Sequence, residues 1–139
     1  MCLSLVIPEC GKNFQVSATA IVRGLQNLVI GTDVYVAPLV VINAITKIEL
    51  SSEVMIGFGS VLVSGNHTRL NSSFRFGASS PSPIYVGMGS WIGANTTVTA
   101  GAYIGSGSCI AANCCVVGRC DNDSVYAGSP SKKVKVFHD

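Results

Sequence analysis

The sequence has few charged residues and lacks the features of exported or membrane-spanning chains. Only 12% of its 139 residues are charged, and a net charge of +2 is too small to favour a nucleic-acid partner. No basic segment precedes a long apolar run at the N-terminus, so a signal peptide is not expected. The longest apolar run, residues 34–42, contains Pro38 and is too short to span a bilayer. We therefore predict a soluble, cytoplasmic protein with one domain over residues 1–139.

The sequence is equally poor in patterns that bind metals. It has two histidines, His67 and His138, and its six cysteines contain no Cys-x-x-Cys pair. A disulfide framework needs an oxidising compartment, for which the sequence offers no export signal. We interpret the cysteines as small buried side chains and expect no metal site.

Branched apolar residues are abundant and recur at every sixth position. One series is Val86, Ile92, Val98, Ile104, Ile110 and Val116, and an earlier one is Ile30, Val36 and Ile42, then, after a two-residue slip, Leu50, Ile56 and Leu62. Six steps along an α-helix turn a position by about 240°, which scatters these residues over three sides. Six is a multiple of two, so short strands can point one residue of each hexad inward. Glycine, asparagine, aspartate and serine between the strands supply turns.

Three such hexads per turn predict a triangular prism of short parallel strands. The inward residues of successive coils would stack about 4.8 Å apart. Four coils are expected, over residues 30–47, 50–67, 86–103 and 104–121. Residues before Ile30 are expected to form a weaker opening coil, because Phe14, Val16, Ile21 and Leu28 do not keep the spacing.

The largest break in the repeat is an insertion at residues 68–85. A long loop inside a compact repeat is usually functional. His67 stands at the root of this insertion, at a corner of the prism. An imidazole titrates near neutrality and can take a proton from a hydroxyl or an amine. We predict that His67 is a general base; the alternative is a structural histidine.

The motifs IGANTT (residues 92–97), IGSGSC (104–109) and YVGMGSW (85–91) resemble those of the hexapeptide-repeat acyltransferases, over about residues 28–137. That resemblance implies an all-β fold, the left-handed parallel β-helix. In members similar to galactoside and maltose O-acetyltransferases, a histidine before such a loop is the general base and a tryptophan follows, as Trp91 does here. By the same resemblance, Asn43 and Asn66 are expected to contact a sugar-type acceptor.

The resemblance implies transfer of the acetyl group of acetyl-CoA to a hydroxyl of a sugar or polysaccharide precursor, without an acyl-enzyme. It also implies a homotrimer with sites between subunits. The residues expected to contact acetyl-CoA are Trp91, Ala94, Ala112, Val117, Gly118 and Arg119, with Lys132, Lys133 and Lys135 available to its phosphates. These lysines belong to a C-terminal tail, residues 122–139. Many relatives carry Thr-Lys where this chain has Val117-Gly118.

Other interpretations remain open at this point. One is an N-acetyltransferase acting on an amino sugar. Another is a non-catalytic scaffold or ice-binding prism, which would need repeated Thr-x-Thr arrays, whereas only Thr97-Val98-Thr99 occurs. A prism like the γ-class carbonic anhydrases needs three histidine ligands, and the chain has two histidines.

Overall fold

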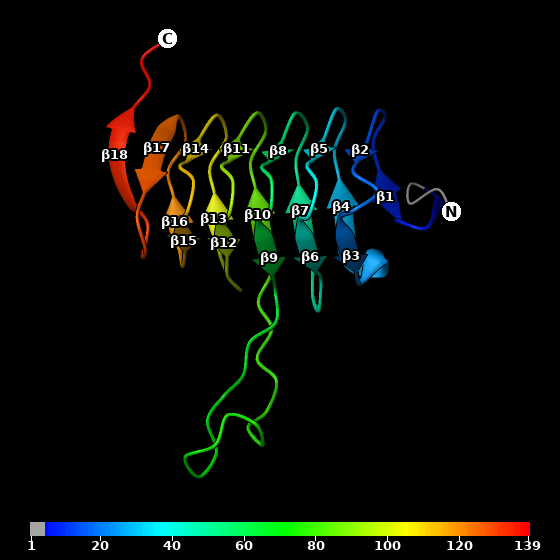
Figure 1. The fold of residues 1–139 in the computed structure, drawn as a ribbon, viewed down its shortest axis with the longest axis vertical. Helices are drawn as coiled ribbons and strands as arrows, with labels where there is room; N and C mark the ends of the chain where they lie inside the picture. The colour runs from blue at the N-terminus through cyan, green and yellow to red at the C-terminus, as the bar shows by residue number, and fades with distance from the viewer. Residues whose placement is uncertain (1–4) are drawn as a thin grey trace.

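A computed structural model describes residues 5–139 as a three-sided coil of short strands (Figure 1). The first sheet contains β1 (Glu9–Cys10), β4 (Leu28–Ile30), β7 (Ile48–Leu50), β10 (Ile84–Val86), β13 (Tyr103–Ile104) and β16 (Arg119–Cys120). The second contains β2 (Gln15–Val16), β5 (Tyr35–Val36), β8 (Met55–Ile56), β11 (Trp91–Ile92), β14 (Cys109–Ile110), β17 (Ser124–Ala127) and β18 (Lys132–Val136). The third contains β3 (Ile21–Arg23), β6 (Val41–Asn43), β9 (Val61–Val63), β12 (Thr97–Val98) and β15 (Cys115–Val116). All strand pairs are parallel except β17 with β18, and the predicted left-handed parallel β-helix is confirmed.

The core consists of inward-pointing columns of side chains from all three sheets. In the first sheet, Leu50 pairs with Val86 and Val86 with Ile104, and all three are fully buried. Burial of each such side chain contributes roughly 1.5–3 kcal/mol. The predicted stacking of one hexad on the next is therefore confirmed as the source of the core.

The expected opening coil before Ile30 is present, and its inward residues Cys10, Val16 and Val22 are only partly buried. Cys10 pairs with Ile30, and Val16 with Val36. Val22 completes the coil by the same kind of pairing in the third sheet. The inward positions follow at steps of six, six and eight residues, because the third corner holds two extra residues in this coil and the next. In the first coil that corner contains the 3-10 turn η2 (Leu25–Asn27).

Hydroxyl groups fill the tight space at the corners and hydrogen-bond the next coil. Ser60 Oγ donates to the Gly93 carbonyl at 2.8 Å, and Ser90 Oγ to the Gly105 carbonyl at 2.7 Å. Thr96 Oγ1 donates in the same way to a carbonyl one coil further on. A buried hydroxyl without such a partner would destabilise the fold. These residues therefore satisfy their own polarity while joining neighbouring coils.

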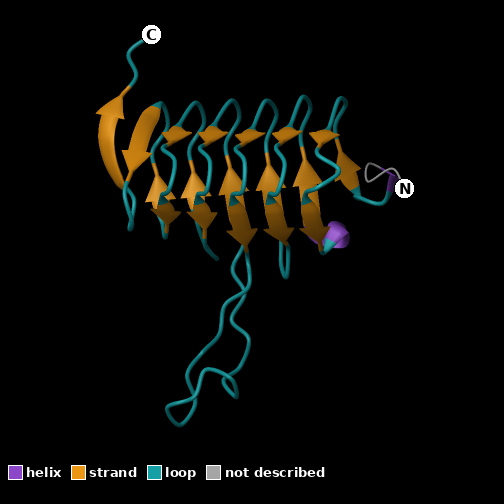
Figure 2. Cartoon of the chain, viewed as in Figure 1, coloured by secondary structure: helices purple, strands orange, loops and turns teal. Residues whose placement is uncertain are grey.

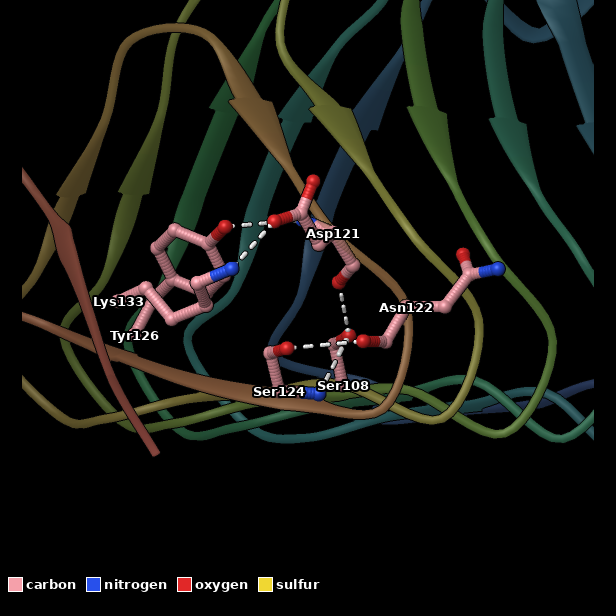
Figure 3. Close-up of polar contacts among 6 residues, drawn as sticks. All are labelled: Ser108, Asp121, Asn122, Ser124, Tyr126 and Lys133. Atoms are coloured by element: carbon pink, nitrogen blue, oxygen red, sulfur yellow. Dashed lines mark hydrogen bonds and ion pairs between the residues drawn. The ribbon is translucent and has the colours of Figure 1, made fainter. Parts of the chain in front are cut away.

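The C-terminal residues 122–139 are joined to the last coil by polar contacts (Figure 3). Lys133 Nζ lies 2.6 Å from Asp121 Oδ2, and the Asp121 N–H donates to the Tyr126 hydroxyl at 2.9 Å. The hydrogen bond and positive charge of Lys133 lower the pKa of the Asp121 carboxyl. Ser108 Oγ donates to the Asp121 carbonyl at 2.6 Å, which ties this turn to the coil before it.

Cys120 takes an inward position earlier than the repeat of six predicts. It follows Val116 by four residues, pairs with Ile104 and is buried. Burial raises the pKa of its thiol to about 11.

This pKa predicts a loss of stability in alkali. Between about pH 8.5, where an unfolded thiol ionises, and pH 11, the folded state keeps a proton that the unfolded state loses. The free energy of unfolding should therefore fall as pH rises, by up to about 1.4 kcal/mol per pH unit. Urea unfolding across this range tests it, with Cys120→Ala as the comparison. Equal slopes in the two proteins would contradict the prediction; Cys109, whose pKa burial also raises, keeps part of the slope in both.

Between β9 and β10 the chain leaves the prism as a long projection, residues 64–83, which we call the arm (Figure 2). The insertion expected at 68–85 ends two residues earlier, because Ile84 and Tyr85 lie in β10. Ile84 pairs with Ile48 and is buried in the core. No helix within residues 5–139 is long and apolar enough to cross a membrane.

Candidate functional site

The arm is fixed to the prism at the corner between the third and first sheets. Ser64, directly after β9, is buried, and its hydroxyl donates to the Thr46 carbonyl at 2.8 Å. The Thr46 N–H donates back to Ser64 Oγ at 3.0 Å, and the Ser82 N–H donates to the Ser64 carbonyl at 2.9 Å. Both ends of the arm therefore meet at one buried serine.

His67 lies three residues beyond this anchor, where the two sides of the arm pair. It forms an isolated antiparallel bridge with Ser79, and the Ser80 N–H donates to the Asn66 carbonyl at 2.8 Å. The His67 N–H donates to Asn66 Oδ1 at 2.9 Å. The backbone of His67 is thus held, while its side chain is exposed to solvent.

A pocket of about 450 Å³ opens beside this corner. It is lined by the end of β9, the root of the arm, β12 with the residues after it, and one residue after β15: Val63, Gly65, Asn66, Thr97, Val98, Thr99, Ala100 and Val117. None of these side chains carries a formal charge. His67 does not line the pocket itself but follows Asn66, which does.

The two residues predicted to contact the acceptor lie on the same side of the prism. Asn66 lines the pocket, and its carboxamide oxygen is occupied by the His67 N–H. Asn43, on β6, pairs with Val63 of the pocket wall and is half-buried. Asn43 therefore lies one coil from the pocket, within the third sheet.

The residues predicted to contact acetyl-CoA are spread around the prism. Val117 lines the pocket, and Gly118 follows it with open space around its Cα. Ala94 and Ala112 lie at the opposite edge of the third sheet, at the corner after the second sheet. Trp91 lies on the second sheet, where its side chain is 51% exposed. One chain therefore does not bring Trp91 together with His67.

Two of the predicted basic contacts, Arg119 and Lys133, have close partners within the chain. The Arg119 guanidinium lies 4.1 Å from the centre of the Tyr103 ring, which stacks on Tyr85 at 4.7 Å. Lys133 is paired with Asp121. Lys132 and Lys135 are exposed on β18. Within residues 5–139, neither of these two lysines forms an ion pair. They are therefore the predicted phosphate contacts that remain open to a ligand.

Sequence reasoning missed the wall of the pocket and the aromatic stack. Val63 and Thr99 line the same pocket although they are far apart in the chain, because β9 pairs with β12 while the arm separates their coils in the sequence. Tyr85 and Tyr103 are separated by one eighteen-residue coil, a spacing that was readable in the sequence. Within residues 5–139, no three histidine, cysteine, aspartate or glutamate side chains are placed to hold a metal ion.

No protein-family model matches the sequence, and no curated protein matches it significantly. Several solved structures do match. A maltose O-acetyltransferase from Clostridium difficile 630 is 22% identical with a TM-score of 0.92, and the match covers 99% of this chain and 73% of that chain.

Two further structures resemble the chain and were solved with CoA thioesters. A hexapeptide-repeat acetyltransferase from Vibrio cholerae O1 biovar eltor, complexed with acetyl coenzyme A, is 23% identical with a TM-score of 0.90 and covers 99% and 75% of the two chains. The N-acyltransferase AntD from Bacillus cereus, complexed with dTDP and 3-hydroxybutyryl-CoA, is 16% identical with a TM-score of 0.76 and covers 96% and 85%. The resemblance to hexapeptide-repeat acetyltransferases is thus confirmed at the level of the fold.

Proposed function

From the fold shared with these acetyltransferases, we propose that the chain transfers the acetyl group of acetyl-CoA to a hydroxyl of a sugar or polysaccharide precursor, with His67 as general base. The observation that carries the proposal is the position of His67. Its imidazole is exposed, its backbone is fixed by Asn66, and it stands at the rim of a pocket lined by small neutral side chains.

The chemistry needs one proton acceptor and no covalent enzyme intermediate. His67 takes the proton of the acceptor hydroxyl, and the hydroxyl oxygen forms a bond to the thioester carbonyl carbon. The carbon–sulfur bond then breaks, and the imidazolium returns the proton to the departing CoA sulfur. The products are the acetyl ester and CoA thiol, and His67 is neutral again.

The third sheet offers a surface that suits the extended pantetheine group of acetyl-CoA. Val117 and Gly118 present little side-chain bulk beside the pocket, so pantetheine can approach the backbone. Ala94 and Ala112 give the same access at the other edge of this sheet. Lys132 and Lys135 are available to contact the phosphates of acetyl-CoA. Lys133 and Arg119 could contact the phosphates only after leaving Asp121 and the Tyr103 ring, respectively.

The electrostatics of the pocket favour a hydroxyl over an amine. An amino sugar is protonated near neutral pH, and its ammonium group needs a nearby carboxylate when it is desolvated. The sequence contains no aspartate or glutamate between Glu53 and Asp121, a segment that includes every residue lining the pocket. A neutral acceptor hydroxyl has no such requirement, and we therefore prefer O-acetylation.

We further propose that the active protein is a cytoplasmic homotrimer with sites between subunits. Exposed Tyr35, Met55 and Trp91 lie in register across the second sheet and form an apolar column that a neighbouring subunit can cover. Trp91 of one subunit would then face the pocket of another, as the separation of Trp91 from His67 within one chain requires.

A thiol-release assay with acetyl-CoA tests the proposed function. Incubation with a panel of sugars, nucleotide sugars and amino sugars should release CoA thiol with a hydroxyl acceptor and yield a base-labile acetyl ester. Faster release with amino sugars, and an amide product, would show N-acetylation instead. Absence of CoA binding by calorimetry would favour a non-catalytic scaffold.

A further inference from the structure

Arg23 is the one charged residue among the five strands of the third sheet. It is the last residue of β3, where its side chain points outward and is exposed, while the preceding Val22 points inward. Within residues 5–139, Arg23 forms no ion pair. The outer face of the third sheet therefore carries a positive charge that the described part of the chain does not neutralise.

The acidic residues lie on other sides of the prism. Glu9 and Glu49 belong to the first sheet, and Asp33 and Glu53 lie at the corner between the first and second sheets. The remaining three follow β16, near the C-terminus: Asp121, Asp123 and Asp139. The strands of the third sheet and the turns that adjoin them contain no carboxylate, so an anionic ligand on this face meets no repulsion.

The backbone of Arg23 is fixed in register with the wall of the pocket. Arg23 pairs with Asn43 of β6, and Asn43 pairs with Val63 of β9, which lines the pocket (Figure 1). The Ala44 N–H donates to the Arg23 carbonyl at 2.9 Å, and Gly24 packs so close to Ala44 that a side chain would not fit. Neighbouring strands lie about 4.8 Å apart, so two steps along the sheet separate Arg23 from the pocket wall by roughly 10 Å.

The order of strands in the third sheet gives the two substrates separate approaches to the pocket. The residues proposed to contact pantetheine, Val117 and Gly118, follow β15 on the C-terminal side of the pocket. Strands β6 and β3 lie on the N-terminal side, where they remain open to the acceptor. An acceptor whose hydroxyl enters the pocket therefore extends past Asn43 toward Arg23. A guanidinium at that end suits a phosphate or carboxylate, which it can bind through two parallel hydrogen bonds.

We propose that the acceptor is an anionic saccharide, whose phosphate or carboxylate group binds Arg23 while its reacting hydroxyl lies in the pocket. The inference rests on the proposed acetyl transfer and names the class of acceptor for it. Arg23 takes no part in the proton transfer and contacts only the distant end of the acceptor. Its loss therefore raises KM for anionic acceptors and leaves kcat nearly unchanged.

Thiol release with matched neutral and anionic sugars tests the inference. The acceptors are glucose, glucose 1-phosphate, glucuronate and UDP-glucose, together with their galactose counterparts. We expect kcat/KM to be about tenfold higher for the anionic sugars, and the comparison of glucuronate with glucose 1-phosphate shows which anion is preferred. Arg23→Gln should remove this preference through KM while leaving kcat/KM for the neutral sugars unchanged. Added salt should weaken the preference in the unchanged protein.

Lys12→Gln is the matched control for the loss of one positive charge. Lys12 is an exposed cation of the same coil, at the corner between the first and second sheets, and its replacement should leave every KM unchanged. Arg23→Lys keeps the charge without the planar guanidinium and should retain part of the preference.

Three results would count against the inference, and they are distinguishable. Equal kcat/KM for neutral and anionic sugars, or an unchanged preference in Arg23→Gln, would overturn it and leave acetyl transfer intact. Thiol release with none of the acceptors would refute the acetyl transfer on which it rests. A smaller oligomeric mass of Arg23→Gln by light scattering would assign Arg23 to a contact between subunits instead.

Discussion

Replacement of His67 by alanine is expected to abolish acetyl transfer in a protein that still folds and still binds acetyl-CoA. A positioned general base contributes typically 10²–10⁴-fold to the rate, so kcat/KM should fall by about that factor. Folding should not change, because the side chain is exposed and only the backbone of His67 is held, by Asn66 and by the bridge to Ser79.

The control for this experiment is the other histidine of the chain. His138 is exposed near the C-terminus, outside the pocket, and His138→Ala should leave kcat/KM unchanged. Thiol release measured with acetyl-CoA and the best acceptor gives the rates, and calorimetry gives acetyl-CoA affinity. Normal turnover by His67→Ala would refute the general-base role.

A large loss of stability is expected from Gly93→Val. A Cβ at Gly93 would lie 2.7 Å from both the Ile110 carbonyl oxygen and the Ala112 nitrogen, which are backbone atoms of the next coil. Neither atom can move without breaking the ladder between coils, so the variant should lose about 3 kcal/mol of unfolding free energy. Loss of the β-sheet signal in thermal or urea unfolding measures it.

Gly118→Val provides the matched comparison for the same change of side chain. A Cβ there meets no atom within 4 Å, so its unfolding free energy should stay close to that of the unchanged protein. If both variants unfold alike, the cost at position 93 does not come from the neighbouring coil.

The fold could be predicted from the sequence because one period determines three columns of core residues. Val86, Ile92 and Val98 each begin a hexad, and each lies inside the prism. The opening coil was predicted less clearly than the others, because a cysteine takes its inward position at Cys10 while Phe14 and other large residues do not keep the spacing. An inward position in the core requires only a side chain of suitable size and low polarity, and cysteine meets both requirements.

The candidate site could be predicted only in part, because it depends on contacts between coils. His67 was found from a break in the repeat, a feature within one segment of the chain. The pocket wall joins Val63 to Thr97 and Val117 on three successive coils, so it needs the register of the third sheet and the length of the arm. The place of Trp91 on another sheet needs the same knowledge.

Strand β18 has a consequence for how copies of this chain can meet. A β-helix whose last coil ends in an open parallel edge invites end-to-end growth into fibres. Here the second sheet ends in an antiparallel strand that carries Lys132, Lys133 and Lys135. A second molecule that stacked on this edge would face a strand of reversed direction and three lysines. The five residues of β18 therefore oppose end-to-end polymerisation at this end of the prism.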